Sequence, residues 1–161
     1  MRVHFIDTSV FLNILGVPGR SDEREKVMPE FIKISESKND VLVLPYATII
    51  ETGNHIAHNG DGRQRRETAQ RFAEALEKTI QNKAPWHYYG RQLTEEDIHE
   101  ICIEFPNAAM QGEGFGDLSI IRAYKRYKEE IPGIEEIRIW TLDKHLASYR
   151  ERVSPLKGRN N

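Results

Sequence analysis

The chain opens with the stretch Arg2-Val3-His4-Phe5-Ile6-Asp7-Thr8-Ser9. Its first part is rich in β-branched and aromatic residues, which is typical of a short buried strand. Asp7-Thr8-Ser9 then supplies side-chain oxygens suited to capping a helix, and apolar residues follow at helical spacing. The stretch therefore predicts a strand, a tight connection and a helix, which is how an α/β fold begins.

Two further stretches predict buried strands. Val41-Leu42-Val43-Leu44 is a short apolar run that Pro45 ends, and a second such run covers residues 137–142. Helical patterns lie between the strands, including a helix over residues 46–58 and a long one over residues 63–82. Strands that alternate with helices favour an α/β sandwich around a parallel sheet.

The rest of the chain gives a less regular pattern. A helix that starts near Thr94 is expected to stop at Pro106, and the glycine-rich residues 107–116 are expected to form a loop. A helix is predicted from Asp117 to about residue 130, and residues 144–150 are predicted as the last helix. No repeat or linker divides the chain, so residues 1–161 are expected to form a single domain, in which residues 59–106 are a helical insertion.

The composition is that of a soluble globular protein, with 39% hydrophobic and 30% charged residues. No apolar stretch is long enough to span a bilayer and no secretion signal is evident, so no membrane partner and a cytoplasmic location are expected. The formal net charge of -2 argues against a general electrostatic attraction to nucleic acid. Local phosphate contacts are still expected from Arg65 and Arg66, although a solvated helix face explains the same pattern.

Four acidic residues lie where the predicted fold brings them together. Asp7 and Asp143 directly follow predicted strands, and sites in parallel α/β sheets form beyond the carboxyl ends of the strands. Glu51 lies about one turn into the helix that follows the second strand, and Asp117 follows a glycine-rich segment that allows a close backbone approach. Carboxylates gathered in this way ordinarily need a divalent cation, because like charges do not all stay ionised together. Oxygen ligands favour Mg²⁺ or Mn²⁺ over zinc.

Each aspartate also has a simpler interpretation, because a single carboxylate after a strand is often the N-cap of a helix. Glu51 is harder to explain in that way. It lies between Ile50 and Ile56 on a helix that is expected to be largely buried, where an unpaired carboxylate is unfavourable. The order and the flanking residues of all four acids favour a shared site.

The four motifs together resemble those of the PIN-domain nucleases, and among them the VapC-like toxin ribonucleases. The motifs that carry the resemblance are Phe5-Ile6-Asp7-Thr8-Ser9-Val10-Phe11, Ile49-Ile50-Glu51, Gly116-Asp117-Leu118 and Trp140-Thr141-Leu142-Asp143-Lys144. They follow one another in this order over the whole chain. The resemblance implies a PIN-like three-layer α/β/α sandwich with a short parallel sheet. It also implies a metal-dependent endoribonuclease that hydrolyses RNA phosphodiester bonds.

The resemblance further implies a role for particular residues. The main ligands of Mg²⁺ or Mn²⁺ would be Asp7, Asp117 and Asp143. Glu51 would complete the catalytic acids, through water or as a ligand of a second metal ion. The side chains that orient the carboxylates or the attacking water would be Thr8, Ser9 and Thr141. A toxin role implies a small antitoxin protein as partner. Members of the family often dimerise, which implies a homodimer.

Two other hypotheses remain open from the sequence. The segment between Glu51 and Asp117 is longer than these toxins usually have, which favours a catalytically weak PIN-like module that binds RNA or protein. A phosphate-accepting aspartate domain of the receiver or phosphatase type also places acids at strand ends. That class expects two adjacent acids near the first strand, and Asp7 has no acidic neighbour.

Overall fold

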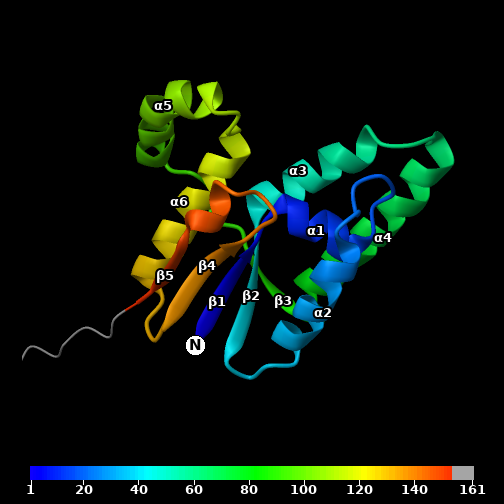
Figure 1. The fold of residues 1–161 in the computed structure, drawn as a ribbon, viewed down its shortest axis with the longest axis horizontal. Coiled ribbons are helices and arrows are strands. Elements are labelled where there is room, and N and C mark those ends of the chain that lie inside the picture. The colour runs from blue at the N-terminus through cyan, green and yellow to red at the C-terminus, as the bar shows by residue number, and fades with distance from the viewer. Residues whose placement is uncertain (154–161) are drawn as a thin grey trace, which may run out of the picture.

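A mostly parallel sheet stands at the centre of the computed structural model, which describes residues 1–153 (Figure 1). The five strands of this part of the chain are Arg2–Ile6 (β1), Asp40–Pro45 (β2), Trp86–Tyr89 (β3), Glu136–Trp140 (β4) and Arg150–Arg152 (β5). Their order across the sheet is β3-β2-β1-β4-β5, so the first strand of the sequence lies in the middle. β1, β2, β3 and β4 run parallel, and β5 runs antiparallel to β4.

Helices cover both faces of this sheet. The α-helices of residues 1–153 are Thr8–Leu15 (α1), Arg24–Ser35 (α2), Tyr46–Ala57 (α3), Gly62–Ile80 (α4), Glu95–Met110 (α5) and Phe115–Glu130 (α6). In Figure 1, α3 and α4 extend to one side of the sheet, and α5 and α6 lie on the other side. The α/β class predicted from the sequence is therefore confirmed, and the arrangement is compatible with a three-layer sandwich. None of these helices is both long enough and apolar enough to cross a membrane.

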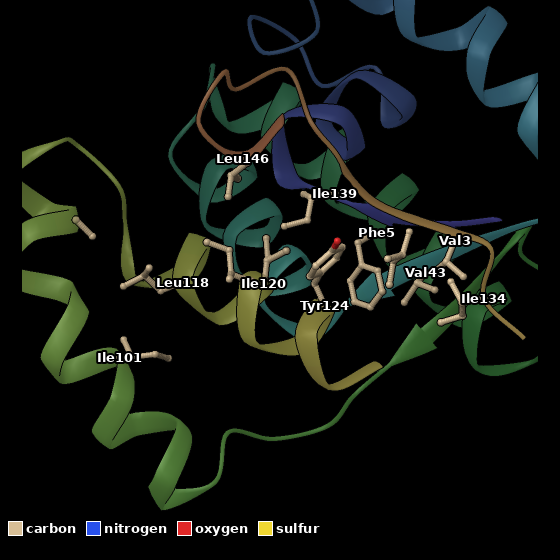
Figure 2. Close-up of a cluster of buried hydrophobic side chains, with 13 residues drawn as sticks. Val3, Phe5, Val43, Ile101, Leu118, Ile120, Tyr124, Ile134, Ile139 and Leu146 are labelled. Atoms are coloured by element: carbon tan, nitrogen blue, oxygen red, sulfur yellow. The ribbon is translucent and has the colours of Figure 1, made fainter. Parts of the chain in front are cut away.

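Strand alternation builds one core on each face of the sheet. Val3 and Phe5 of β1 point to one face, where they pack with Ile120 and Tyr124 of α6 (Figure 2). Ile6 points to the other face and joins a second cluster that includes Phe11 of α1. Because β1 is buried on both faces, it reads as an almost continuous apolar run, as central parallel strands do.

A buried polar network interrupts the apolar alternation of β1. Nε2 of His4 lies 2.7 Å from Oδ1 of Asp40, and the Arg138 Nε donates to the His4 Nδ1 at 2.7 Å. Since Nδ1 accepts a hydrogen bond from Arg138, His4 is the neutral tautomer that donates from Nε2. Burial lowers the pKa of His4, which agrees with this neutral state. The network joins β1, β2 and β4 at the end of the sheet opposite the helix-capping acids.

Two sequence predictions about the C-terminal half are wrong. The helix predicted over residues 144–150 is a 3₁₀ turn, Leu146–Ser148, followed by the strand β5. Contacts across the sheet favour the strand: the Arg150 Nε donates to Glu136 at 2.7 Å, and Glu151 accepts from the Tyr124 hydroxyl at 2.9 Å. The sheet is therefore mixed rather than purely parallel.

The predicted stop at Pro106 is also wrong, because α5 continues through Pro106 to Met110. A proline in a helix leaves the carbonyl four residues earlier without its partner, and here that carbonyl belongs to the exposed residue Cys102, where water can reach it. The predicted loop over residues 107–116 is correspondingly shorter. The range 59–106, expected as a helical insertion, also contains β3, which pairs with β2 at the edge of the sheet. Residues 154–161 of the predicted domain lie outside the described residues.

The Asp40 network predicts a specific dependence of stability on pH. Burial alone would raise the pKa of Asp40, but hydrogen bonds led by that from Arg2 outweigh it and lower the pKa to about 2. A lowered pKa contributes stability above the unfolded-state value near 3.8, and this contribution is lost as the pH falls toward about 2. Asp40→Asn should therefore reduce the free energy of unfolding by about 2 kcal/mol at neutral pH, and by progressively less below about pH 4.

Denaturant unfolding of both proteins across this pH range measures the difference. Asp22→Asn, at an exposed position before α2, is the matched control and should change little. A difference between wild type and Asp40→Asn that stays constant down to about pH 2 would contradict the network.

Candidate active site

The first and last sequence motifs meet at the carboxyl ends of β1 and β4. Asp7 follows β1 directly and is the N-cap of α1, and its backbone N–H donates to the carbonyl of Trp140 at 3.0 Å. Asp143 follows β4 after two residues. Because the two strands are parallel neighbours, both aspartates lie at the end of the sheet where the parallel strands have their carboxyl ends.

Two hydroxyl groups fix the orientation of the Asp7 carboxylate. The Ser9 and Thr141 hydroxyls each donate to its Oδ2 at 2.7 Å. The Thr141 hydroxyl in turn accepts the backbone N–H of Asp143 at 2.9 Å. Thr141 therefore links the Asp7 carboxylate to the backbone of Asp143. Asp7 is buried, with only 4% of its surface exposed.

Glu51 reaches the same carboxyl end of the sheet from α3. The Thr8 hydroxyl donates to its Oε2 at 2.8 Å. Burial raises the pKa of Glu51 despite this hydrogen bond, and the negative charges of Asp117 and Asp7 raise it further. Glu51 is thus a partly buried carboxylate that faces two others.

Asp117 approaches from the first turn of α6. Its Oδ2 accepts the backbone N–H of Gly114 at 2.8 Å. Burial is the main cause that raises the pKa of Asp117, and the nearby charges of Asp7 and Asp143 contribute in the same direction. Asp117 is therefore close enough to Asp7 and Asp143 to be influenced by their charges, and its own charge influences Glu51.

Gly116 makes room for the Glu51 carboxylate. A Cβ atom at this position would overlap the carboxylate, so any other residue would displace Glu51 or α6. The reason for glycine here is space rather than backbone strain. The Gly114-Phe115-Gly116 segment therefore brings α6 against the acids, as its glycines predicted.

Each of the three aspartates accepts a backbone N–H near the start of a helical segment, but only Asp7 is the N-cap residue of its helix. Asp143 Oδ1 accepts the backbone N–H of His145 at 2.7 Å at the start of the 3₁₀ turn, and Asp143 is exposed. Asp7 is the N-cap of α1, whereas Gly114 is the N-cap of α6 and Asp117 is the third residue of that helix, whose side chain accepts the Gly114 N–H. The N-cap interpretation from the sequence therefore holds for Asp7, and the cation site stays a prediction.

The donor set fits a hard divalent cation. All four side chains offer carboxylate oxygens, and their mutual repulsion would be relieved by a positive charge between them. Within residues 1–153, no group of three or more His, Cys, Asp or Glu side chains is close enough to hold a metal ion as the side chains stand. The carboxylates would have to move closer together to hold an ion.

The basic residues beside the acids differ from those expected. Arg65 and Arg66 lie in the first turns of α4 and border a small groove between α3 and α4. Arg91, Arg122 and Arg126, by contrast, line a cavity of about 490 Å³ whose wall also includes Glu51. Arg122 and Arg126 lie one turn apart on α6, a spacing that places both on one helix face, whereas Arg91 follows β3.

No protein-family model matches the chain, and no curated protein matches it either. The interpretation of the site therefore depends on its own residues and geometry.

The raised pKa of Glu51 predicts that this carboxylate destabilises the metal-free protein at neutral pH. The pKa of Glu51 in the folded protein lies above its unfolded-state value near 4.5. The contribution of Glu51 to stability is therefore fully present below that value and is lost as the pH rises through the folded-state pKa. Glu51→Gln should therefore raise the melting temperature of the metal-free protein at neutral pH, and the gain should vanish below about pH 4. Thermal unfolding in the presence of a chelator measures it.

Glu74→Gln, on an exposed face of α4, is the matched control for charge removal. A lower melting temperature for Glu51→Gln at neutral pH would show that the negative charge is well accommodated, contrary to this account.

Proposed function

We propose that the protein is a PIN-like, Mg²⁺- or Mn²⁺-dependent endoribonuclease that hydrolyses RNA phosphodiester bonds. The observation that carries the proposal is that four acids from separate elements lie at the carboxyl end of the parallel strands. These acids are Asp7, Glu51, Asp117 and Asp143. Desolvation and mutual repulsion raise the pKa of two of them, Glu51 and Asp117. Titratable groups perturbed in this way are more frequent at functional sites than elsewhere.

The acids have distinct parts in the proposed reaction. Asp7, Asp117 and Asp143 would hold the cation, and the bound cation would supply charge to the phosphate and acidify a water molecule. Ser9 and Thr141 fix the Asp7 carboxylate by donating to the same oxygen, which would leave its other oxygen to hold the cation. Thr8 does the same for Glu51.

Glu51 is suited to take up the proton that the attacking water loses. Its pKa is raised, chiefly by burial, which makes it a better proton acceptor than an exposed glutamate. In the hydrolysis, the water oxygen forms a bond to phosphorus as the bond from phosphorus to the leaving ribose oxygen breaks. The leaving oxygen is then protonated, so that the products are a phosphate monoester and a hydroxyl end.

A PIN-like module that binds RNA or a protein without cutting is the second candidate. The cavity beside Glu51 favours this candidate because it offers space for a ligand. Binding alone also requires no cation. Affinity for RNA with no cleavage in either metal would support this candidate. The toxin role, the antitoxin partner and the homodimer stay predictions from the resemblance.

Removal of one ligand charge is the first test. Asp7→Asn and Asp117→Asn should each reduce cleavage of single-stranded RNA to background in Mg²⁺ and in Mn²⁺, because the cation loses an anionic ligand. Isothermal titration with Mn²⁺ should show weaker binding by the same variants. Glu74→Gln should cut RNA at the wild-type rate.

Circular dichroism and melting temperatures separate loss of chemistry from loss of fold. Wild-type protein that cuts no RNA in either metal and binds no Mn²⁺ would contradict the nuclease proposal.

Removal of the hydroxyl that aims Asp7 should have a smaller effect. Thr141→Val preserves the shape of the side chain but donates no hydrogen bond to Asp7 and accepts none from Asp143. The cleavage rate should fall by about 10- to 100-fold, the usual effect of losing a group that orients a metal ligand. Thr141→Ser should restore most of the rate, and an unchanged rate in Thr141→Val would show that the hydroxyl does not position Asp7.

A further inference from the structure

The cavity beside Glu51 lies between α3, α6, the start of α5 and the segment that follows β3. Its volume is about 490 Å³, within the range of about 300–1,000 Å³ that is usual for ligand pockets. Glu51 and Gly116 form part of its wall, so the cavity and the acid cluster share a boundary. Any group that fills the cavity therefore lies next to the proposed reaction.

Large apolar side chains line this cavity and are left open to solvent. Tyr46 is 49% exposed, Ile50 is 45% exposed and Phe115 is 41% exposed. Tyr46 and Phe115 are the first residues of α3 and α6, so two helix starts present an aromatic side chain to the same space. Such a concentration of exposed apolar groups at a polar site indicates a surface that a ligand covers.

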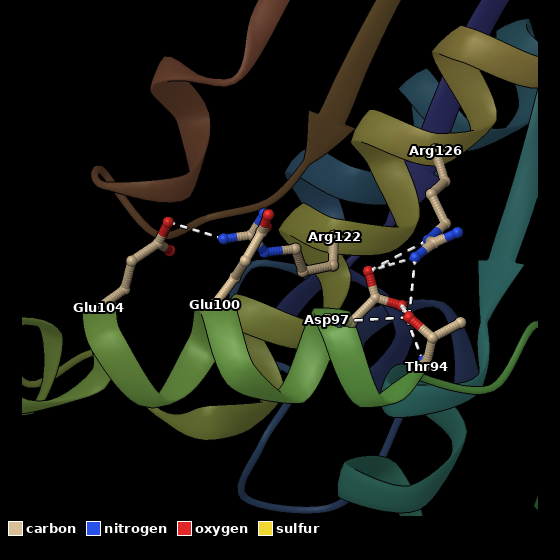
Figure 3. A network of polar contacts seen from close by, with 6 residues as sticks. All are labelled: Thr94, Asp97, Glu100, Glu104, Arg122 and Arg126. Carbon is tan, nitrogen blue, oxygen red and sulfur yellow. Dashed lines mark hydrogen bonds and ion pairs between the residues drawn. The ribbon is translucent and has the colours of Figure 1, made fainter.

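Ion pairs hold the arginines of the cavity in fixed positions. Arg122 is paired with Glu100 and Glu104 of α5, and Arg126 is paired with Asp97 (Figure 3). Arg91 is likewise paired with Glu130. Because each guanidinium already has a carboxylate partner, the cavity has little positive charge to spare for a phosphate backbone.

Aromatic faces without surplus positive charge fit a nucleobase better than a phosphate. Every base offers a π-face to stack on, and stacking on aromatic side chains is how proteins hold unpaired bases. Gln92 and Ser119 in the cavity lining supply amide and hydroxyl groups that can meet the polar edge of a base. The chain's net charge of -2 agrees with recognition that does not depend on general electrostatic attraction.

We propose that this cavity is a base pocket, which receives one unpaired nucleobase of the RNA, next to the phosphate that is cut. Tyr46 and Phe115 provide the stacking surfaces, and Gln92 and Ser119 contact the edge of the base. The inference depends on the proposed function, because it assigns the base pocket to the same RNA. It restricts the substrate to RNA that is single-stranded at the cleavage site, since a paired base stays in its stack.

Fluorescent RNA tests the base pocket directly. The Asp7→Asn protein, which should bind RNA without cutting it, is titrated with short single-stranded RNAs of mixed sequence that carry 2-aminopurine at successive positions. Stacking in the base pocket should change the fluorescence strongly at one or two adjacent positions. In the same background, Tyr46→Ala and Phe115→Leu should each weaken RNA binding by about tenfold.

The controls separate loss of stacking from loss of fold. Ile80→Ala removes an exposed apolar side chain from α4, outside the cavity, and should leave RNA affinity unchanged. Phe115 packs edge-on against Phe105, so its variant is compared by melting temperature, and Tyr46→Ala provides a second variant at an independent position. The Asp117→Asn background repeats the titration with Asp7 intact.

The outcomes distinguish the base pocket from the nuclease proposal. Wild-type protein that cuts RNA, with Tyr46→Ala and Phe115→Leu equally active and position-specific fluorescence absent, overturns the base pocket and leaves the nuclease proposal standing. Position-specific fluorescence without cleavage by wild type supports the base pocket and overturns the nuclease proposal. Binding of an apolar dye that Tyr46→Ala removes, with RNA affinity unchanged, assigns the cavity to an apolar protein partner and also overturns the base pocket.

Discussion

The bond between the Thr141 hydroxyl and the Asp7 carboxylate is the contact on which the site depends. It joins residues 134 positions apart and links the end of β1 to the end of β4. The Asp7 N–H to the Trp140 carbonyl fixes the same junction through the backbone. With the two strand ends held together, α1 starts beside the segment that carries Asp143, where the Leu142 N–H donates to the Ser9 hydroxyl, and Glu51 reaches the junction through Thr8. The register of the two central strands therefore sets the geometry of the acids.

This arrangement places like charges together at the edge of an apolar fold. The raised pKa values of Glu51 and Asp117 have desolvation as their first cause, and repulsion within the cluster adds to it. Helix-capping bonds and hydroxyl donors offset part of that unfavourable free energy, and the two cores beside β1 supply the stability that tolerates the rest. Groups kept in unfavourable surroundings by a stable scaffold are typical of sites built for binding or chemistry.

Local sequence predicted the elements that are governed by local patterns. The mostly apolar runs at residues 2–6 and 41–44 are strands buried on both faces, with His4 as a buried polar exception, and α3 begins directly after Pro45 as expected. The helix prediction for residues 144–150 is wrong because contacts with other parts of the chain favour a strand there. Arg150 binds Glu136, and Glu151 binds Tyr124 and Lys128. The acids were identified from their positions after strands and glycines. Arg122 and Arg126 are four residues apart in α6, which places them on one helix face, but local sequence does not show that this face borders a cavity shared with Arg91.

The central claim is that the four acids form a cation site, and anomalous diffraction from crystals soaked in Mn²⁺ tests it most directly. The account predicts an anomalous peak among Asp7, Asp117 and Asp143, bordered by Glu51, that is absent from crystals of Asp117→Asn. Soaked crystals with intact side chains that show no peak at these acids, or a Mn²⁺ ion bound only elsewhere on the protein, would contradict it.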